Sequence, residues 1–171
     1  MQSMVSFLKT KELHYLYRIN QNIKCSFLDK FMTFITYFGS LPVTVVLLAV
    51  LFRSSNSSLV TAGQALAIVQ VLSQLTVHLL KWLTNRPRPF RTWKEIIAEH
   101  PPTSKRSFPS GHTCAAFASA LTIASFYPSS AALLIPLAAL VGISRIYLGA
   151  HYPSDVLGGC MVAIIAWAVV L

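Results

Sequence analysis

The chain has 171 residues, of which 54% are hydrophobic and 11% are charged, and an excess of Lys and Arg gives it a formal net charge of +9. A water-soluble domain carries roughly a quarter charged residues. This composition, with a mean hydropathy of +0.60, therefore excludes an ordinary soluble domain and predicts a membrane protein. The basic residues form no basic and aromatic module of the kind that binds nucleic acid. We expect no nucleic-acid partner and interpret the positive charge as affinity for membranes and phosphate.

Residues 1–30 interleave apolar side chains such as Phe7 and Leu16 with basic ones such as Lys9 and Arg18. This pattern predicts an amphipathic helix that lies on the membrane surface. The segment is too polar to span a bilayer. It also lacks the uninterrupted apolar core and small-residue cleavage site of a signal peptide.

The rest of the chain is expected to form an all-α membrane bundle, in one domain with the N-terminal segment. A bilayer crossing needs about 20 apolar residues, and five stretches meet this expectation: 31–53, 58–83, 110–127, 131–149 and 155–171. Residues 39–42 (Gly-Ser-Leu-Pro) interrupt the first stretch, so it is either one crossing, which we favour, or an interfacial helix followed by a short span. In the last stretch, Gly158, Gly159 and Ala163 are expected to allow close helix packing.

The second stretch is unusual because it carries several polar side chains inside an apolar segment: Gln64, Gln70, Ser73, Gln74 and His78. Such residues are expected to face neighbouring helices instead of lipid. His78, one turn before Lys81, is interpreted as a packing residue.

Three short blocks carry the residues that point to chemistry: 81–89, 109–112 and 144–155. If the predicted helices alternate in direction, all three blocks lie on one membrane face. The loops on the other face, 53–58 and 127–130, are short and hold no candidate catalytic group. The three cysteines, Cys25, Cys114 and Cys160, have no disulfide or metal-ligand spacing, so no metal site is expected.

The blocks supply groups that bind a phosphoryl oxyanion. Lys81, Arg88 and Arg145 are fixed cations, Ser110 is suited to cap a helix, and Gly111 lets backbone approach an anion. Any one of these cations alone is as readily explained as a helix anchor at lipid headgroups. All three in this pattern favour a phosphate site.

Two histidines and one aspartate complete the inventory. His151 and Asp155 are four residues apart around Pro153, a good first helical residue, so the carboxylate can hold one ring nitrogen and leave the other free. His112 follows Gly111 in the first turn of its helix, near the same anion. An isolated His in an apolar chain is more often structural, and the residues alone do not decide which His is the nucleophile, although the spacing to Asp155 favours His151.

The order and spacing of the blocks resemble the signature of the type 2 phosphatidic acid phosphatase superfamily: Lys81, six residues, Arg88-Pro89; Pro109-Ser110-Gly111-His112; Ser144-Arg145, five residues, His151, three residues, Asp155. The resemblance implies a two-step phosphoryl transfer without metal or other cofactor. In this scheme His151 attacks phosphorus, Asp155 orients it, and His112 protonates the leaving oxygen and later activates water. The phosphate is then held by Lys81, Arg88, Ser110, Gly111 and Arg145. The N-terminal segment would replace a further spanning helix found in longer members.

The expected substrate is a lipid whose tail stays in the bilayer: undecaprenyl pyrophosphate, phosphatidylglycerophosphate or phosphatidic acid. Two rival functions are a vanadate haloperoxidase, which the apolar helices disfavour because those enzymes are soluble, and a non-catalytic protein that binds or transports lipid phosphates. The presence of both histidines and the aspartate favours the phosphatase.

Loop cations are expected to steer an anionic headgroup or simply to be solvated: Arg86, Arg91, Lys94, Lys105 and Arg106. Phe90, Trp93 and Phe108 are expected at the membrane interface.

The membrane orientation follows from two opposed signals. Nearly every Lys and Arg lies on the face of the three blocks, which the positive-inside rule assigns to the cytoplasm, whereas the resemblance implies an outward-facing site. We follow the resemblance, because chemistry accounts for three of these cations and an interfacial helix for the N-terminal ones. The expectation is a bacterial plasma-membrane protein with an extracytoplasmic site.

Overall fold

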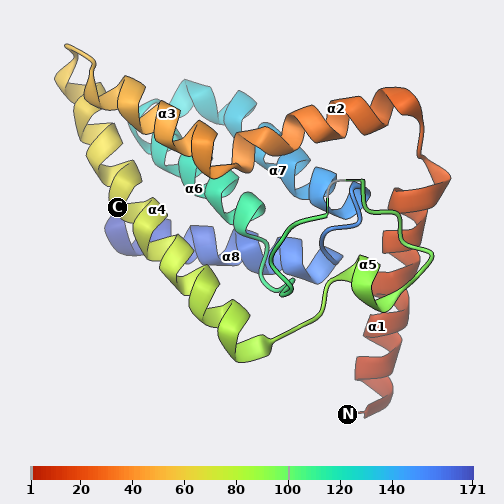
Figure 1. Ribbon diagram of the computed structural model, residues 1–171. Helices are drawn as coiled ribbons and strands as arrows, with labels where there is room; N and C mark the ends of the chain where they lie inside the picture. Colours follow the sequence, from red (N-terminus) through yellow and green to blue (C-terminus); the bar gives the residue numbers. More distant parts are fainter. Residues whose placement is uncertain (1, 100) are drawn as a thin grey trace.

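The structure is a computed structural model that describes residues 2–99 and 101–171, with side chains from residue 10 onward. Figure 1 shows the helices, which are listed here in chain order: α1 (Gln2–Tyr17), a π-helical turn (Arg18–Asn22), α2 (Ser26–Thr36), α3 (Leu41–Phe52), α4 (Ser57–Thr84), α5 (Pro89–Thr92), α6 (Gly111–Phe126), α7 (Ala131–Tyr147) and α8 (Pro153–Val170). A short loop, residues 85–88, precedes α5, and a long loop connects α5 to α6. The predicted all-α class is confirmed.

Helix α6 lies at the centre of the bundle, between α4, α7 and α8. Its buried residues are mostly small, including Cys114, Ala116 and Ala118, so the neighbouring helices approach closely. The expectation for α8 holds, because a Cβ at Gly159 would lie 2.5 Å from the carbonyl oxygen of Ser110. This contact brings the start of α6 against the second turn of α8.

Among the described residues, three helical segments are long and apolar enough to cross a membrane: α4, α7 with its preceding turn (Pro128–Tyr147), and α8. The segments Ser26–Gly39 and Leu41–Phe52 pass the same test together, although they are bent by 51° where the sequence predicts an interruption. Helix α6 has 16 residues, fewer than a straight crossing needs. The structure thus gives three or up to four candidate spans, and the fifth stays a prediction.

The N-terminal segment packs against the loop end of the bundle. Leu16 is fully buried in a cluster with Ile96, Ile146 and Tyr152. The buried Asn20 amide donates to the carbonyl oxygens of Ile97 and Tyr147, at 2.9 and 2.7 Å, and its oxygen accepts from the Ile97 amide. The side chains of residues 1–9, including Phe7 and Lys9, lie outside the described part, so their role on the membrane surface stays a prediction.

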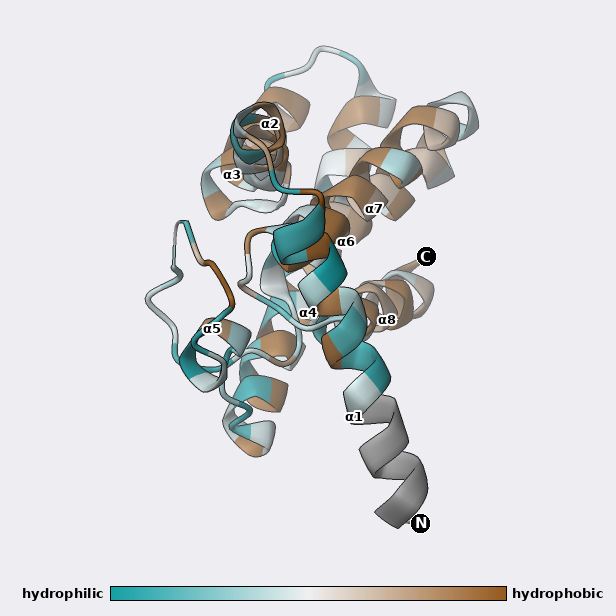
Figure 2. Cartoon of the chain, turned by 90° about the vertical axis from the view of Figure 1, so that its right-hand side faces the viewer, coloured by the Kyte–Doolittle hydropathy of each residue, from teal (hydrophilic) through white to brown (hydrophobic). Residues whose placement is uncertain are grey.

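Hydropathy divides the molecule into two regions. Figure 2 shows hydrophobic residues over α3, α6, α7 and α8, whereas hydrophilic residues gather on α1, on α5 and in the adjoining loops. This end of the bundle is where the three sequence blocks lie. The fold therefore places the polar, charge-bearing residues at one end of the apolar helices.

Candidate active site

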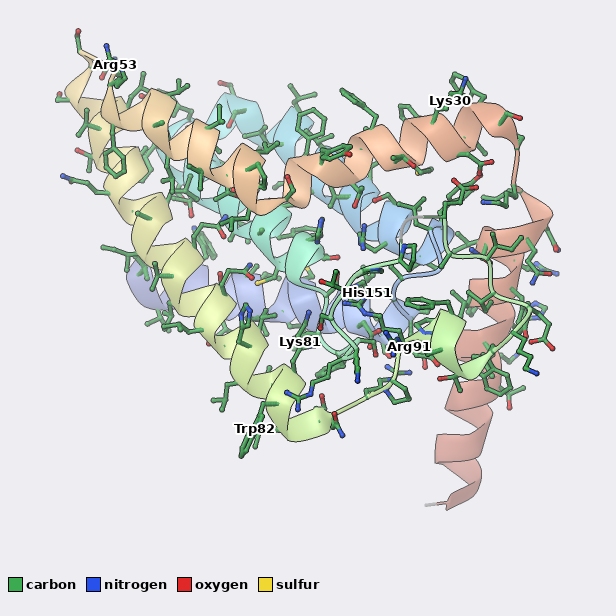
Figure 3. The ribbon with its side chains drawn as sticks, viewed as in Figure 1. Lys30, Arg53, Lys81, Trp82, Arg91 and His151 are labelled. Atoms are coloured by element: carbon green, nitrogen blue, oxygen red, sulfur yellow. The ribbon has the colours of Figure 1, made fainter. Side chains whose placement is uncertain are left out.

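The three sequence blocks converge at one end of the bundle, as predicted. Lys81 comes from the last turns of α4 and His151 from the loop between α7 and α8, and Figure 3 shows both near the same loops, far from Arg53 at the opposite end. His112, in the first turn of α6, is within electrostatic range of His151, Lys81 and the guanidinium groups of Arg88 and Arg145. The predicted catalytic and phosphate-binding residues thus form one cluster.

The start of α6 is fixed by Ser110. Its hydroxyl oxygen accepts from the Thr113 amide and from the Thr113 hydroxyl, at 3.4 and 2.9 Å, and its own amide donates to the Asp155 carbonyl oxygen. Both side-chain bonds use Ser110 Oγ as an acceptor, so its hydroxyl proton stays available for an anion. A Cβ at Gly111 would have Gln74 Oε1 as its nearest neighbour, at 3.6 Å. That distance is an ordinary van der Waals contact, and the binding of an oxyanion at this turn stays a prediction.

His151 and Asp155 are both almost fully buried, with 2% and 0% of their surface exposed. Asp155 Oδ2 accepts from the Tyr152 amide at 2.9 Å and lies 3.4 Å from His151 Nδ1. This second distance is longer than a normal hydrogen bond, and His151 Nδ1 has no hydrogen-bond partner among the described residues. His151 and Asp155 are therefore adjacent, as their spacing predicts, but are not joined by a hydrogen bond.

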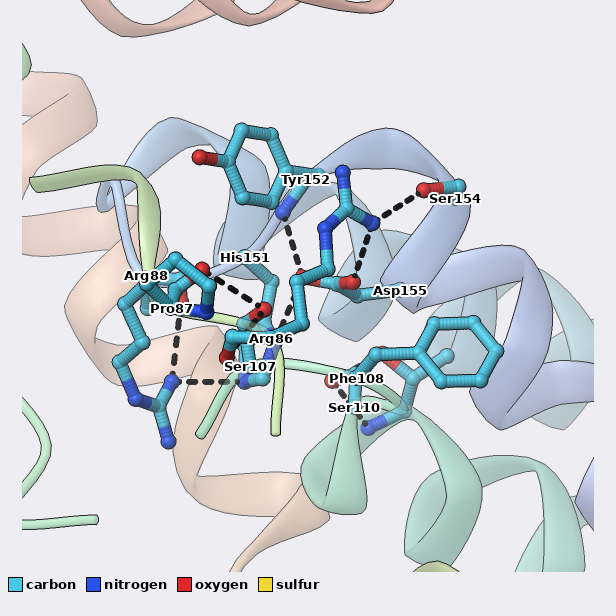
Figure 4. A network of polar contacts seen from close by, with 12 residues as sticks. Arg86, Pro87, Arg88, Ser107, Phe108, Ser110, His151, Tyr152, Ser154 and Asp155 are labelled. Atoms are coloured by element: carbon cyan, nitrogen blue, oxygen red, sulfur yellow. Dashed lines mark hydrogen bonds and ion pairs between the residues drawn. The ribbon is translucent and has the colours of Figure 1, made fainter. Parts of the chain in front are cut away.

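The tautomer of His151 follows from its contact with Arg88. Arg88 Nη1 lies 3.1 Å from His151 Nε2 (Figure 4). A guanidinium can only donate, so Nε2 is the acceptor and the ring proton is on Nδ1, facing Asp155. This is the tautomer in which Nε2 carries the lone pair that a nucleophile needs.

Burial and positive charge keep His151 neutral. Its burial, followed by the charges of Arg145, Arg88 and Lys81, holds its pKa well below the ordinary value of a histidine. The imidazole is therefore uncharged near neutral pH.

The cations of the site are partly buried and incompletely paired. Arg88 is 2% exposed and donates to the carbonyl oxygens of Ser104 and Ala150, at 2.6 and 2.9 Å. Burial lowers the pKa of Arg88 to about 10, which leaves it charged at neutral pH. Arg145 is 6% exposed; its Nη1 donates to Thr36 Oγ1, whereas its buried Nε has no partner among the described residues. A buried cationic donor without an acceptor favours the binding of an anion.

Sequence reasoning missed part of the network around Asp155. Arg86, expected to steer substrate from a loop, instead donates to Asp155 Oδ1 at 2.8 Å, and its other end pairs with Glu12. The position of Arg86, two residues before Arg88, could have indicated that it belongs to the site. No sequence pattern could have indicated Glu12, because it lies 74 residues from Arg86 in the chain.

Some of the other loop residues have the predicted environment and others do not. Arg91, Lys94 and Lys105 are exposed, as expected for solvated or steering cations. Trp93 is exposed, but Phe108 packs against α8 at Gly158, because the missing side chain there makes room for the ring. Phe90 packs beside the cluster of Leu16 instead of standing free at an interface.

An apolar groove of about 440 Å³ runs between α3, α4 and α6 and ends at Gly111 and His112. Its walls are mainly apolar and include Leu41, Val45, Leu48, Ala67, Val71 and Ala115. His78 also lines it and is exposed, with Nδ1 bonded to the Gln74 carbonyl oxygen, so its interpretation as a packing residue is wrong.

Some of the other polar residues of α4 face a neighbouring helix, as predicted, and one does not. Gln70 and Gln74 bond to α6 as predicted, at Ala115 O and Gly111 O, and Ser73 is buried. Gln64 is exposed instead, contrary to the expectation that it faces a neighbouring helix.

The comparisons with known proteins agree with this geometry. A model of the PAP2 superfamily matches residues 60–171. The chain is 34% identical to undecaprenyl-diphosphatase BcrC of Bacillus subtilis, over 82% of this chain and 72% of that protein. The crystal structure of Aquifex aeolicus LpxE superposes with a TM-score of 0.83 and 33% identity, over 92% of both chains. The crystal structure of a transmembrane PAP2 type phosphatidylglycerolphosphate phosphatase from Bacillus subtilis gives a TM-score of 0.77 and 26% identity, over 95% of this chain and 84% of that one.

Proposed function

The chain belongs to the PAP2 superfamily and is a metal-independent lipid phosphatase, and from this premise we propose that it hydrolyses a polyprenyl diphosphate with His151 as the nucleophile. The observation that carries the assignment of His151 is its tautomer. Nε2 has the free electron pair, and Nδ1 carries the proton beside Asp155.

In the first step, His151 Nε2 forms a bond to phosphorus as the bond from phosphorus to the leaving oxygen breaks. His112, which must be protonated once the anionic substrate is bound, gives that proton to the leaving oxygen, and Asp155 stabilises the positive charge that develops on the His151 ring. Arg88 must first leave Nε2, and a bound phosphate supplies the oxygens to which it can move. In the second step, water attacks phosphorus, His112 accepts a proton from it, and the bond to Nε2 breaks to release inorganic phosphate.

The phosphate oxygens are proposed to lie among Lys81, Arg88, Arg145 and the first turn of α6. The Nε of buried Arg145, which has no partner among the described residues, supports this arrangement. Ser110 contributes its hydroxyl proton. Fixed donors of this kind stabilise the charge of the transition state without reorganising.

The groove at His112 is the proposed site of the lipid. His112 protonates the leaving oxygen, so the leaving group must lie on the His112 side, which is where the groove ends. Its residues Leu41, Val45 and Val71 are highly exposed on the bundle surface, so a chain bound there can stay continuous with the bilayer interior. A single isoprenoid chain suits one groove beside the site, and BcrC is an undecaprenyl-diphosphatase.

Phosphatidylglycerophosphate is a second candidate substrate, because it has two acyl chains and a second apolar groove lies beside the first in the described part of the chain. The second groove, of about 270 Å³, lies between α3, α6 and α7 and shares Thr44 with the first. The two grooves flank α3. A two-chain lipid would place one chain on each side of that helix.

The test is phosphate release by purified protein in detergent with a chelator present. Undecaprenyl diphosphate, phosphatidylglycerophosphate and phosphatidic acid are compared in parallel, beside a His151→Ala variant. We expect release that the substitution abolishes and that is fastest for the diphosphate. Faster release from phosphatidylglycerophosphate would assign the second substrate. No release above the variant from any lipid would favour a non-catalytic protein that binds lipid phosphates.

We also propose that the site faces the extracytoplasmic side of a bacterial plasma membrane and that α6 completes five crossings. A Lys105→Cys variant in a background without Cys25, Cys114 and Cys160 tests the orientation. Labelling of intact cells by a membrane-impermeant maleimide supports it. Labelling only after lysis assigns the site to the cytoplasm.

A further inference from the structure

Arg86 lies in the loop after α4 and joins three parts of the chain. Its Nη1 donates to Asp155 Oδ1 at 2.8 Å and to Ser154 Oγ at 2.7 Å, and its Nη2 donates to Glu12 Oε2 at 2.8 Å. The guanidinium carbon lies 3.9 Å from the centre of the Tyr152 ring. Figure 4 shows the guanidinium beside Tyr152, with its bonds to Asp155 and Ser154. The side chain is therefore fixed by both charge and stacking.

Glu12 extends this network from α1 to the start of α8. Its Oε2 pairs with Arg86, and its Oε1 accepts from the Ser154 amide at 2.9 Å and from the Ser154 hydroxyl. Ser154 is in the first turn of α8, where amides lack helical partners and negative charge is favoured. A carboxylate from the N-terminal helix thus caps the helix that carries Asp155.

Both carboxylate oxygens of Asp155 are held by this arrangement. Oδ1 accepts from Arg86, and Oδ2 accepts from the Tyr152 amide and faces His151 Nδ1. A fully buried carboxylate that loses a charged partner is strongly disfavoured. Arg86 therefore fixes the orientation of the Asp155 carboxylate and favours its charged form.

The signs of the charges add a second effect. Glu12, Arg86 and Asp155 form a row of negative, positive and negative groups. Because Arg86 is shared with Glu12, it neutralises Asp155 only in part. Enough negative charge then remains on Asp155 to stabilise the positive ring that forms when His151 attacks phosphorus.

We propose that Arg86 is a positioning residue that acts on His151 through Asp155, and that Glu12 makes the N-terminal helix part of this machinery. The inference rests on the proposed roles of His151 and Asp155. It differs from a role in steering substrate, because the bonds of Arg86 go to Asp155, Ser154 and Glu12.

The first test is kinetic and separates positioning from phosphate binding. Arg86→Ala is expected to lower kcat about 10- to 100-fold, while KM and the inhibition constant of inorganic phosphate change little. Arg86→Lys keeps the charge but not the paired donors and is expected to recover part of kcat. Glu12→Gln is expected to lower kcat less than Arg86→Ala. Arg53→Ala, at the opposite end of the bundle, is the control for loss of an arginine.

A double-mutant cycle tests whether Arg86 acts through Asp155. If it does, Arg86→Ala has little further effect on phosphoenzyme formation in an Asp155→Asn background. Additive losses would overturn the proposal, as would a wild-type kcat in Arg86→Ala. An equal rise in KM and in the phosphate inhibition constant would assign Arg86 to substrate binding instead.

Nuclear magnetic resonance of labelled histidine separates this inference from the proposed function. Arg86→Ala is expected to shift the Nδ1–H resonance of His151, and Arg53→Ala is expected to leave it unchanged. If the wild type releases no phosphate from any lipid, the proposed function fails and this spectrum alone decides the positioning role. An unshifted resonance in Arg86→Ala, and in the milder Arg86→Lys if the former does not fold, overturns it.

Discussion

Arg88 Nη1 lies 3.1 Å from the His151 Nε2 atom that is proposed to attack phosphorus. The proposed nucleophile is therefore bonded to a residue of the proposed phosphate site. Substrate has to exchange this bond for one between Arg88 and a phosphate oxygen. Under this proposal, the binding of the phosphate and the release of His151 Nε2 are the same event.

Arg88→Lys is expected to reduce kcat/KM about 100-fold or more, the loss typical of one transition-state donor. Arg88 bonds to Ser104 O through Nε and to Ala150 O through Nη1, which are separate nitrogens of a rigid fork. A lysine has one nitrogen and cannot reproduce these bonds and also present paired donors to phosphate. Phosphate release from the preferred lipid measures the effect. Lys105→Arg, a charge-conserving change at an exposed loop position, is the control. An Arg88→Lys enzyme with unchanged kcat/KM would contradict the assignment.

The protonation of His151 in the free protein is expected to occur well below the ordinary pKa of histidine, because burial and three cations disfavour the charged ring. The neutral, nucleophilic form exists above that pKa, so the free enzyme keeps its nucleophile as the pH falls from 7 to 6. Arg88→Gln removes one of the cations and is expected to raise the pKa of His151. A histidine titration by nuclear magnetic resonance, assigned with His151→Gln, checks both statements. A wild-type midpoint near that of a free histidine would contradict the first.

The sequence was most informative where interacting residues are close together in the chain. His151 lies just before α8 and Asp155 lies in its first turn, and Ser110 caps the helix that begins at Gly111, so local spacing was enough to predict these relationships. The ion pair of Arg86 with Glu12 depends on how α1 packs against α8, and no local pattern encodes that. Phe108 was predicted at the membrane interface, but its ring packs against α8 at Gly158. The space for this ring exists only when α6 and α8 are packed together, so the sequence around Phe108 could not indicate it.

Ala67→Phe is expected to lower kcat/KM for long-chain lipid phosphates and to leave that for a water-soluble aryl phosphate nearly unchanged. Ala67 lines the groove that ends at His112, so a ring there competes with the lipid chain but not with the phosphate. Ala132→Phe, on an exposed position of α7, is the matched control. Equal losses on both substrates would show that the groove does not hold the lipid.

Gly39→Ala is expected to destabilise the protein by about 1–3 kcal/mol, the usual range for overpacking, and to lower activity. A Cβ at Gly39 would lie 2.4 Å from the His112 carbonyl oxygen, so the bend between α2 and α3 would have to move away from α6. That movement also displaces Thr36, which holds Arg145 Nη1 at 2.7 Å.

Thermal unfolding in detergent and phosphate release measure the two effects of Gly39→Ala. Gly111→Ala gives the contrast, because its Cβ meets no atom nearer than 3.6 Å. We expect Gly111→Ala to keep the unfolding temperature of the wild type and to weaken inhibition by inorganic phosphate. If both variants unfold at the wild-type temperature, the bend at Gly39 is not what holds Thr36 and His112 in place.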